Sequence, residues 1–158
     1  MSKIKWKTYA FWILLAEAVG ALSGWLTREG AARYAENVIK PPFSPPGIVF
    51  PVVWAILYAL MGIAAARVWL SPPGSERTEG IVLFGTQLAF NFFWSIFFFN
   101  LEAFGFALLW LLALWLLILW MTLIFRKTDR TAALFQVPYL LWVLFAGYLN
   151  LGVWILNP

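Results

Sequence analysis

Amide and aromatic side chains recur at helical spacing in three apolar segments of the chain. At about 100° per residue they share one face of each segment: Trp54 and Tyr58 in the first, Gln87, Asn91 and Trp94 in the second, and Tyr139, Trp142, Ala146 and Asn150 in the third. Proteins hold planar, mostly apolar ligands between flat aromatic walls with a few convergent polar groups. The three faces therefore predict a binding site for such a ligand, although the amides of Gln87 and Asn91 also suit hydrogen bonds between neighbouring helices.

The chain lacks two residue types that many catalytic and metal centres use. It has no histidine and no cysteine, so it offers no imidazole or thiolate to a zinc, haem or iron–sulfur centre. A conventional nucleophile–base pair is absent for the same reason. We therefore expect no metal, no resident cofactor and no hydrolase chemistry.

The composition indicates a membrane protein. Of the 158 residues, 63% are hydrophobic and 11% are charged, which is too few charges to cover a soluble domain of this size. Apolar stretches close to the roughly 20 residues that span a bilayer occupy residues 9–26, 50–70, 80–99, 104–125 and 131–155. None of them alternates as a barrel strand does. The sequence predicts an all-α integral membrane protein, a single domain of five transmembrane helices.

Basic residues are distributed unevenly between the two ends of this predicted bundle. One end carries Lys3, Lys5, Lys7, Arg67, Arg77, Arg126, Lys127 and Arg130, whereas the other carries Arg28, Arg33 and Lys40. The positive-inside rule then places the N-terminus in the cytoplasm and the C-terminus outside. The net charge of +4 follows from this bias rather than from nucleic-acid binding. With no transit-peptide composition, the bias favours a bacterial cytoplasmic membrane.

A proline-rich loop separates the first two predicted spans. Residues 27–49 form this link, in which Pro41, Pro42, Pro45 and Pro46 prevent regular helix. Loops of this length are usually functional or disordered. We expect a stiff, structured loop that caps the following helix.

Two further features lie within the predicted helices. Glu17 is charged, and Ala21 and Gly24 on its face indicate that it points toward close-packed backbone. An intramembrane carboxyl is either a functional group, such as a proton-coupling site, or a protonated packing residue. Gly85 and Ala89 lie opposite the amide face and permit close approach by another helix, such as one from a second subunit.

Three motifs give the chain a resemblance to a known family. They are the Lys40–Gly62 stretch, Gln87-x-x-x-Asn91-x-x-Trp94, and Pro138-Tyr139-x-x-Trp142-x-x-Phe145-Ala146-x-x-x-Asn150-x-x-x-Trp154. In this order they resemble the translocator protein family, also called the tryptophan-rich sensory protein or peripheral benzodiazepine receptor family. The resemblance implies a compact five-helix bundle, commonly a homodimer, whose pocket is closed by the loop between the first two helices.

The resemblance also implies ligands and site residues. Family members bind porphyrins such as protoporphyrin IX, and benzodiazepine-type and isoquinoline ligands. Carried over to this chain, the ligand-binding residues are Pro42, Phe43, Trp54, Tyr58, Gln87, Asn91, Trp94, Tyr139, Trp142, Ala146 and Asn150. Residues 149–154 lack the tyrosine and the following basic residue of the cholesterol motif proposed for mammalian members. Cholesterol binding is therefore not expected.

Three functions remain open on these residues. The first is a membrane receptor or sensor that binds a tetrapyrrole, namely protoporphyrin IX. The second is an enzyme that degrades porphyrin with light and oxygen, as reported for some family members, with Trp54 and Trp142 as the reacting indoles. The third is a small proton-coupled exporter in which Glu17 binds a cation among aromatic side chains.

Overall fold

Within the described residues, five helices are long and apolar enough to cross a membrane. The computed structural model describes residues 3–158. In chain order, its elements are α1 (Lys3–Leu26), α2 (Arg28–Asn37), α3 (Val49–Trp69), α4 (Ser75–Ser95), the π-helical turn η1 (Ile96–Asn100), α5 (Phe104–Thr128), α6 (Arg130–Leu134) and α7 (Val137–Leu156). The described residues contain no strand. The predicted fold class is confirmed.

The link between the first two spans is only partly a loop. Its first half forms α2, a helix of ten residues, where a continuous stiff loop was expected. The reason is local, because the segment Arg28–Asn37 contains good helix formers such as alanine and glutamate, and the prolines begin only at Pro41. The loop proper runs from residue 38 to residue 48.

The last span is interrupted where a continuous helix was expected. α6 ends at Leu134 and α7 begins at Val137, one residue before Pro138. A proline has no N–H to donate, so it breaks a helix interior but is tolerated in the first turn, where that N–H would have no partner. Pro138 therefore lies in the first turn of a new helix. Gln136 is fully buried at this break, and neither atom of its amide group is hydrogen-bonded within the described residues.

The five spans pack through small residues and indole hydrogen bonds. α1 lies against α3 at Gly62, where a Cβ atom would collide with the backbone of Ile13. α4 packs on α5 with the rings of Phe90 and Trp110 stacked 4.2 Å apart. α5 packs on α7, and the indole N–H of Trp115 donates to the carbonyl of Leu140 at 3.1 Å.

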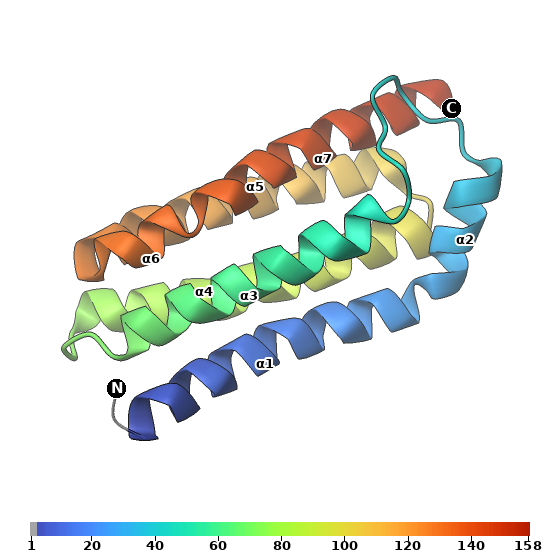
Figure 1. The fold of residues 1–158 in the computed structure, drawn as a ribbon. Helices are drawn as coiled ribbons and strands as arrows, with labels where there is room; N and C mark the ends of the chain where they lie inside the picture. The colour runs from blue at the N-terminus through green and yellow to red at the C-terminus, as the bar shows by residue number, and fades with distance from the viewer. Residues whose placement is uncertain (1–2) are drawn as a thin grey trace.

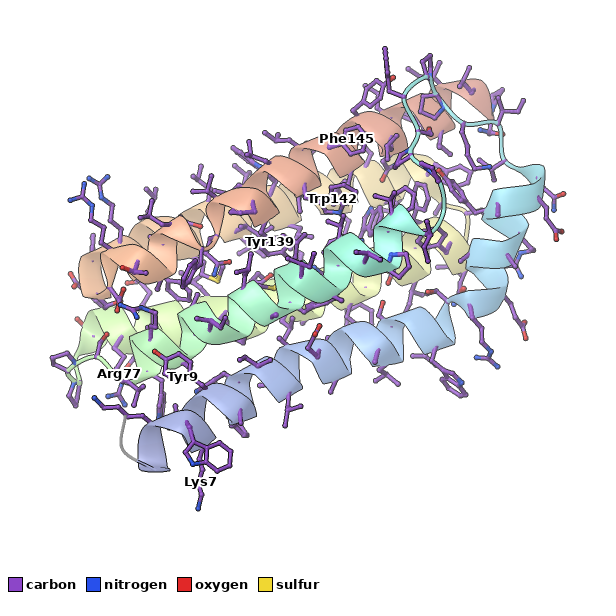
Figure 2. All side chains as sticks on the ribbon, viewed as in Figure 1. Lys7, Tyr9, Arg77, Tyr139, Trp142 and Phe145 are labelled. Carbon is purple, nitrogen blue, oxygen red and sulfur yellow. The ribbon has the colours of Figure 1, made fainter. Side chains whose placement is uncertain are left out.

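The two ends of the bundle differ in charge, as the sequence predicts. The start of α1, the α3–α4 turn and α6 lie at one end, and α2, the proline-rich loop and the end of α7 lie at the other (Figure 1). Lys7 and Arg77 both mark the first end (Figure 2). There the guanidinium of Arg67 pairs with Asp129 at 3.2 Å. The side chain of Lys3 lies outside the described part of the chain.

Candidate functional site

A cavity of about 860 Å³ lies at the end of the bundle that carries α2 and the proline-rich loop. Its walls come from α1, α2, the loop, α3, α4, η1 and α7. The volume is within the range of about 300–1,000 Å³ that small-molecule sites occupy. Most lining residues are apolar or aromatic. The cavity is therefore suited to a sizeable, mostly apolar ligand.

Seven of the predicted ligand-binding residues line this cavity: Trp54, Tyr58, Asn91, Trp94, Trp142, Ala146 and Asn150. They come from α3, α4 and α7, so the three faces selected by helical spacing do converge. Gln87 and Tyr139 are not among the lining residues, and they are 0% and 1% exposed. Each lies about one helical turn beyond a lining residue, which at 1.5 Å per residue is roughly 5 Å further into the bundle. Figure 2 shows this order along α7, with Tyr139, Trp142 and Phe145 successively closer to the loop.

Gln87 and Tyr139 belong to a hydrogen-bonded network beneath the cavity. The phenol of Tyr58 donates to Oδ1 of Asn91 at 2.7 Å, and Nδ2 of Asn91 donates to the hydroxyl oxygen of Tyr139 at 2.7 Å. Tyr139 donates in turn to Oε1 of Gln87 at 2.7 Å, and Nε2 of Gln87 meets the sulfur of Met61 at 3.8 Å. We call these five residues the floor network. It links α3, α4 and α7, so the amides of Gln87 and Asn91 do form hydrogen bonds between helices, and Asn91 also lines the cavity.

The polar groups of Trp94, Asn150 and Trp142 differ in whether they are hydrogen-bonded within the protein. The indole N–H of Trp94 donates to Oδ1 of Asn150 at 3.1 Å, and Nδ2 of Asn150 donates to the carbonyl of Phe104 at 2.8 Å. This pair is satisfied internally and fixes the wall between α4 and α7. The indole nitrogen of Trp142 is buried and has no hydrogen-bond partner within the described residues. Because this nitrogen has almost no accessible surface, Trp142 presents its ring to the cavity rather than its N–H.

Aromatic rings are already arranged against one another at the wall of the cavity. Trp54 stacks on Tyr58 with ring centroids 5.6 Å apart and an angle of 30°. Trp142 meets Phe50 edge-on at 5.9 Å. On α4 and η1, Trp94 stacks on Phe98 at 5.1 Å. These contacts hold the indole faces in place before any ligand enters.

Lining residues outside the predicted set come from α1, α2, the loop and η1 as well as from the three predicted helices. From α1 they include Glu17, Gly20, Ala21, Ser23 and Gly24, and from η1 Phe98 and Phe99. The expectation that Glu17 faces close-packed backbone is wrong, because Glu17 itself lines the cavity. A Cβ atom on Gly24 of the same face would also meet nothing within 4 Å. The small residues on this face of α1 leave room for the cavity. In the sequence, the run of small residues next to the Glu17 carboxyl was the signal that could have indicated this wall of the cavity.

The π-helical turn explains how two consecutive phenylalanines reach the cavity. A π-helix turns by less per residue than an α-helix, which brings neighbouring side chains toward one side. Phe98 and Phe99 both line the cavity one turn beyond Ser95. The hydroxyl groups of Ser95 and Ser23 are hydrogen-bonded to each other and join α4 to α1. Spacing at 100° per residue places Phe98 on the face of Trp94, four residues earlier, but it does not place Phe99 there.

The predicted loop residues Pro42 and Phe43 are not among those that line the cavity. Phe43 has a φ of 66° and its side chain is 87% exposed. The turn that gives Phe43 this conformation is closed by Ser44, whose hydroxyl donates to the carbonyl of Pro41 at 2.7 Å. Its neighbours Lys40, Ser44, Pro45 and Gly47 line the cavity instead.

The loop is fastened to the end of α7. Asn157 accepts from the backbone N–H of Ile39 at 3.0 Å and donates to its carbonyl at 2.8 Å. The phenol of Tyr148 donates to the carbonyl of Pro42 at 2.7 Å.

Tyr34 lines the cavity from α2. Burial raises the pKa of its phenol, so this hydroxyl stays protonated near neutral pH. Loop and α2 together act as a cover on the cavity.

Asn157→Leu is expected to loosen this cover. The substitution removes both hydrogen bonds to Ile39, so hydrogen exchange of residues 38–47 should be about tenfold faster. Exchange measured by mass spectrometry checks this, with Asn37→Leu as the control, since Asn37 is exposed on α2. Equal exchange in the two variants would show that Asn157 does not hold the loop.

Known proteins resemble this chain over nearly its whole length. The model of the TspO/MBR family matches residues 12–155. The tryptophan-rich protein TspO of Chlorobaculum tepidum is 39% identical over 155 residues, which cover 96% of each chain. Protein CrtK of Rhodobacter capsulatus is 36% identical, covering 95% of this chain and 92% of its own, and the translocator protein of Bos taurus is 31% identical, covering 94% and 89%. On this evidence the chain belongs to the TspO/MBR family of membrane proteins.

Proposed function

We propose that this integral membrane protein is a receptor for a planar tetrapyrrole, with protoporphyrin IX as the ligand to test first. The observation that carries the proposal is the convergence of Trp54, Trp94 and Trp142 on one cavity of about 860 Å³. A flat, largely apolar macrocycle gains both area burial and ring contacts between such walls. Isoquinoline and benzodiazepine-type ligands suit the same walls.

The polar groups of the cavity suit the rest of such a ligand. Asn91 and Asn150 bring amide groups to the lining from α4 and α7. At the loop, Lys40 contributes a positive charge to the lining, which favours ligand carboxylates at that end. The ligand would then lie with its acidic edge toward the loop and its apolar edge toward the floor network.

A second candidate is light-dependent degradation of the bound porphyrin. Trp54 and Trp142, the two tryptophans expected to react, both line the cavity. An excited porphyrin can exchange an electron with an adjacent indole, and dissolved oxygen would serve as the oxidant. No metal or general base is needed for this step.

We also propose how the protein assembles and how it is oriented in the membrane. Gly85 and Ala89 lie exposed on the outer face of α4, where a Cβ on Gly85 would meet nothing within 4 Å. This small-residue face suits close helix packing in a homodimer. The basic end of the bundle would face the cytoplasm of a bacterial cell, with the cover over the cavity outside.

Tryptophan quenching by protoporphyrin IX in detergent tests the proposal, first in the dark and then under illumination. Trp142→Phe should weaken binding by about tenfold, because it removes ring area from the wall of the cavity. The matched control is Trp120→Phe, since Trp120 is exposed on α5 and does not line the cavity. The absence of saturable quenching in the wild type would contradict the receptor.

The illuminated half of the experiment separates the two candidates. Loss of the porphyrin absorption band in the wild type and in Trp120→Phe, but not in Trp142→Phe saturated with ligand, would support degradation. A porphyrin absorption band that stays stable in all three proteins would support a receptor that does not degrade its ligand. Binding and band loss reduced to the same extent by Trp142→Phe would count against a chemical role for this indole.

A further inference from the structure

Two charged residues line the cavity, Glu17 of α1 and Lys40 of the loop. The ammonium group of Lys40 donates to three backbone carbonyls, those of Tyr34 and Ala35 at 3.1 Å and that of Val38 at 3.2 Å. An ammonium group has three N–H donors. All three donors of Lys40 are therefore used at the end of α2, and none is left for the carboxyl of Glu17.

Glu17 makes no hydrogen bond or ion pair within the described part of the chain. The phenol of Tyr58 lines the same cavity, but it donates its proton to Asn91. Gly20, Ala21 and Gly24 follow along the lining of α1. These three residues have no polar side chain, which leaves the cavity as a place where a partner for the carboxyl can bind.

The surroundings of Glu17 favour one class of partner. A carboxylate inside a membrane protein is stabilised by a cation or by strong N–H donors. The faces of aromatic rings also attract cations, most strongly those of tryptophan. Trp54 and Tyr58 of α3 and Trp94 of α4 line the same cavity. One carboxyl among aromatic walls is a recognition site for a positively charged planar ring.

We propose that Glu17 makes this cavity selective for planar aromatic ligands that carry a positive charge or strong N–H donors on the edge facing α1. Any acidic groups of such a ligand lie at the opposite, loop end. The inference rests on the proposed function in one respect, because the cavity has to admit a planar ring. It goes beyond that function because it assigns the charge of the ligand and the residue that recognises this charge.

Three probes of the same shape and different charge test the inference. They are the N-methylacridinium cation, acridine buffered where it is uncharged, and an anthracene carboxylate. Binding to the full-length protein in detergent is followed by tryptophan quenching. The wild type should bind the cation about tenfold more tightly than neutral acridine, and Glu17→Gln should abolish that preference. Neutral acridine should bind both proteins within about threefold, and thus report that the variant cavity is intact.

A matched control separates recognition from the overall charge. Glu36→Gln changes the net charge equally, but Glu36 is exposed on α2 and does not line the cavity, so the cation preference should persist. Equal affinity for all three probes in the wild type would overturn the inference alone. The same holds if Glu17→Gln weakens all three equally. Failure of every probe to bind would overturn both the inference and the proposed planar-ligand cavity.

Discussion

Gly62→Leu is expected to separate α1 from α3 and to destabilise the protein by at least about 3 kcal/mol. A Cβ atom at this position would collide with the backbone N and Cα atoms of Ile13. A flexible side chain could move aside, but a helix backbone cannot move without displacing α1 as a whole. α1 supplies one wall of the cavity, so ligand binding should be lost together with stability.

Thermal unfolding in detergent, with and without ligand, measures both effects of this substitution. Gly147→Leu is the control, because a Cβ on Gly147 of α7 meets nothing within 4 Å and leucine is a better helix former than glycine. The control should unfold at or slightly above the wild-type temperature. Equal stability of the two variants would show that α1 and α3 are not held at the distance that Gly62 permits.

The fold and the ligand-facing side of three helices could be predicted from the sequence because both follow from local periodicity. Hydrophobic length determines which segments span a bilayer, and spacing places Trp54, Asn91 and Trp142 toward the interior of the bundle. All three line the cavity. Periodicity says nothing, however, about depth along a helix. For that reason Gln87 and Tyr139 were predicted as ligand contacts but lie below the cavity, in the floor network.

The parts that could not be predicted depend on tertiary contacts or on departures from α-helical geometry. Phe99 lines the cavity beside Phe98 in a π-helical turn, whereas helical spacing at 100° per residue places only Phe98 on the face of Trp94. Phe43 points away because of a positive φ within a turn closed by Ser44. Glu17 shares its face with small residues, which predict either close packing or open space. The choice between the two depends on how α1 lies against α3.

Asn91→Leu is expected to damage the floor network and the cavity together. Leucine has a similar volume, so little space is created, but Tyr58 loses its acceptor and Tyr139 loses its donor. A buried hydroxyl left without a partner costs about 1–3 kcal/mol, and interhelical hydrogen bonds within membranes average nearer 0.6 kcal/mol. We expect a loss of about 1–4 kcal/mol in stability and a clear loss of affinity for a planar ligand.

Tyr58→Phe in the Asn91→Leu background shows whether the unpaired hydroxyl is the cause. Removing both partners of a hydrogen bond costs less than removing one, so the double variant should be more stable than Asn91→Leu alone. The comparison uses the same thermal unfolding measurement for the wild type, both single variants and the double variant. Simple additivity of the two single effects would mean that Tyr58 and Asn91 do not act as a pair. The floor network would then fill space beneath the ligand without ordering the cavity above it.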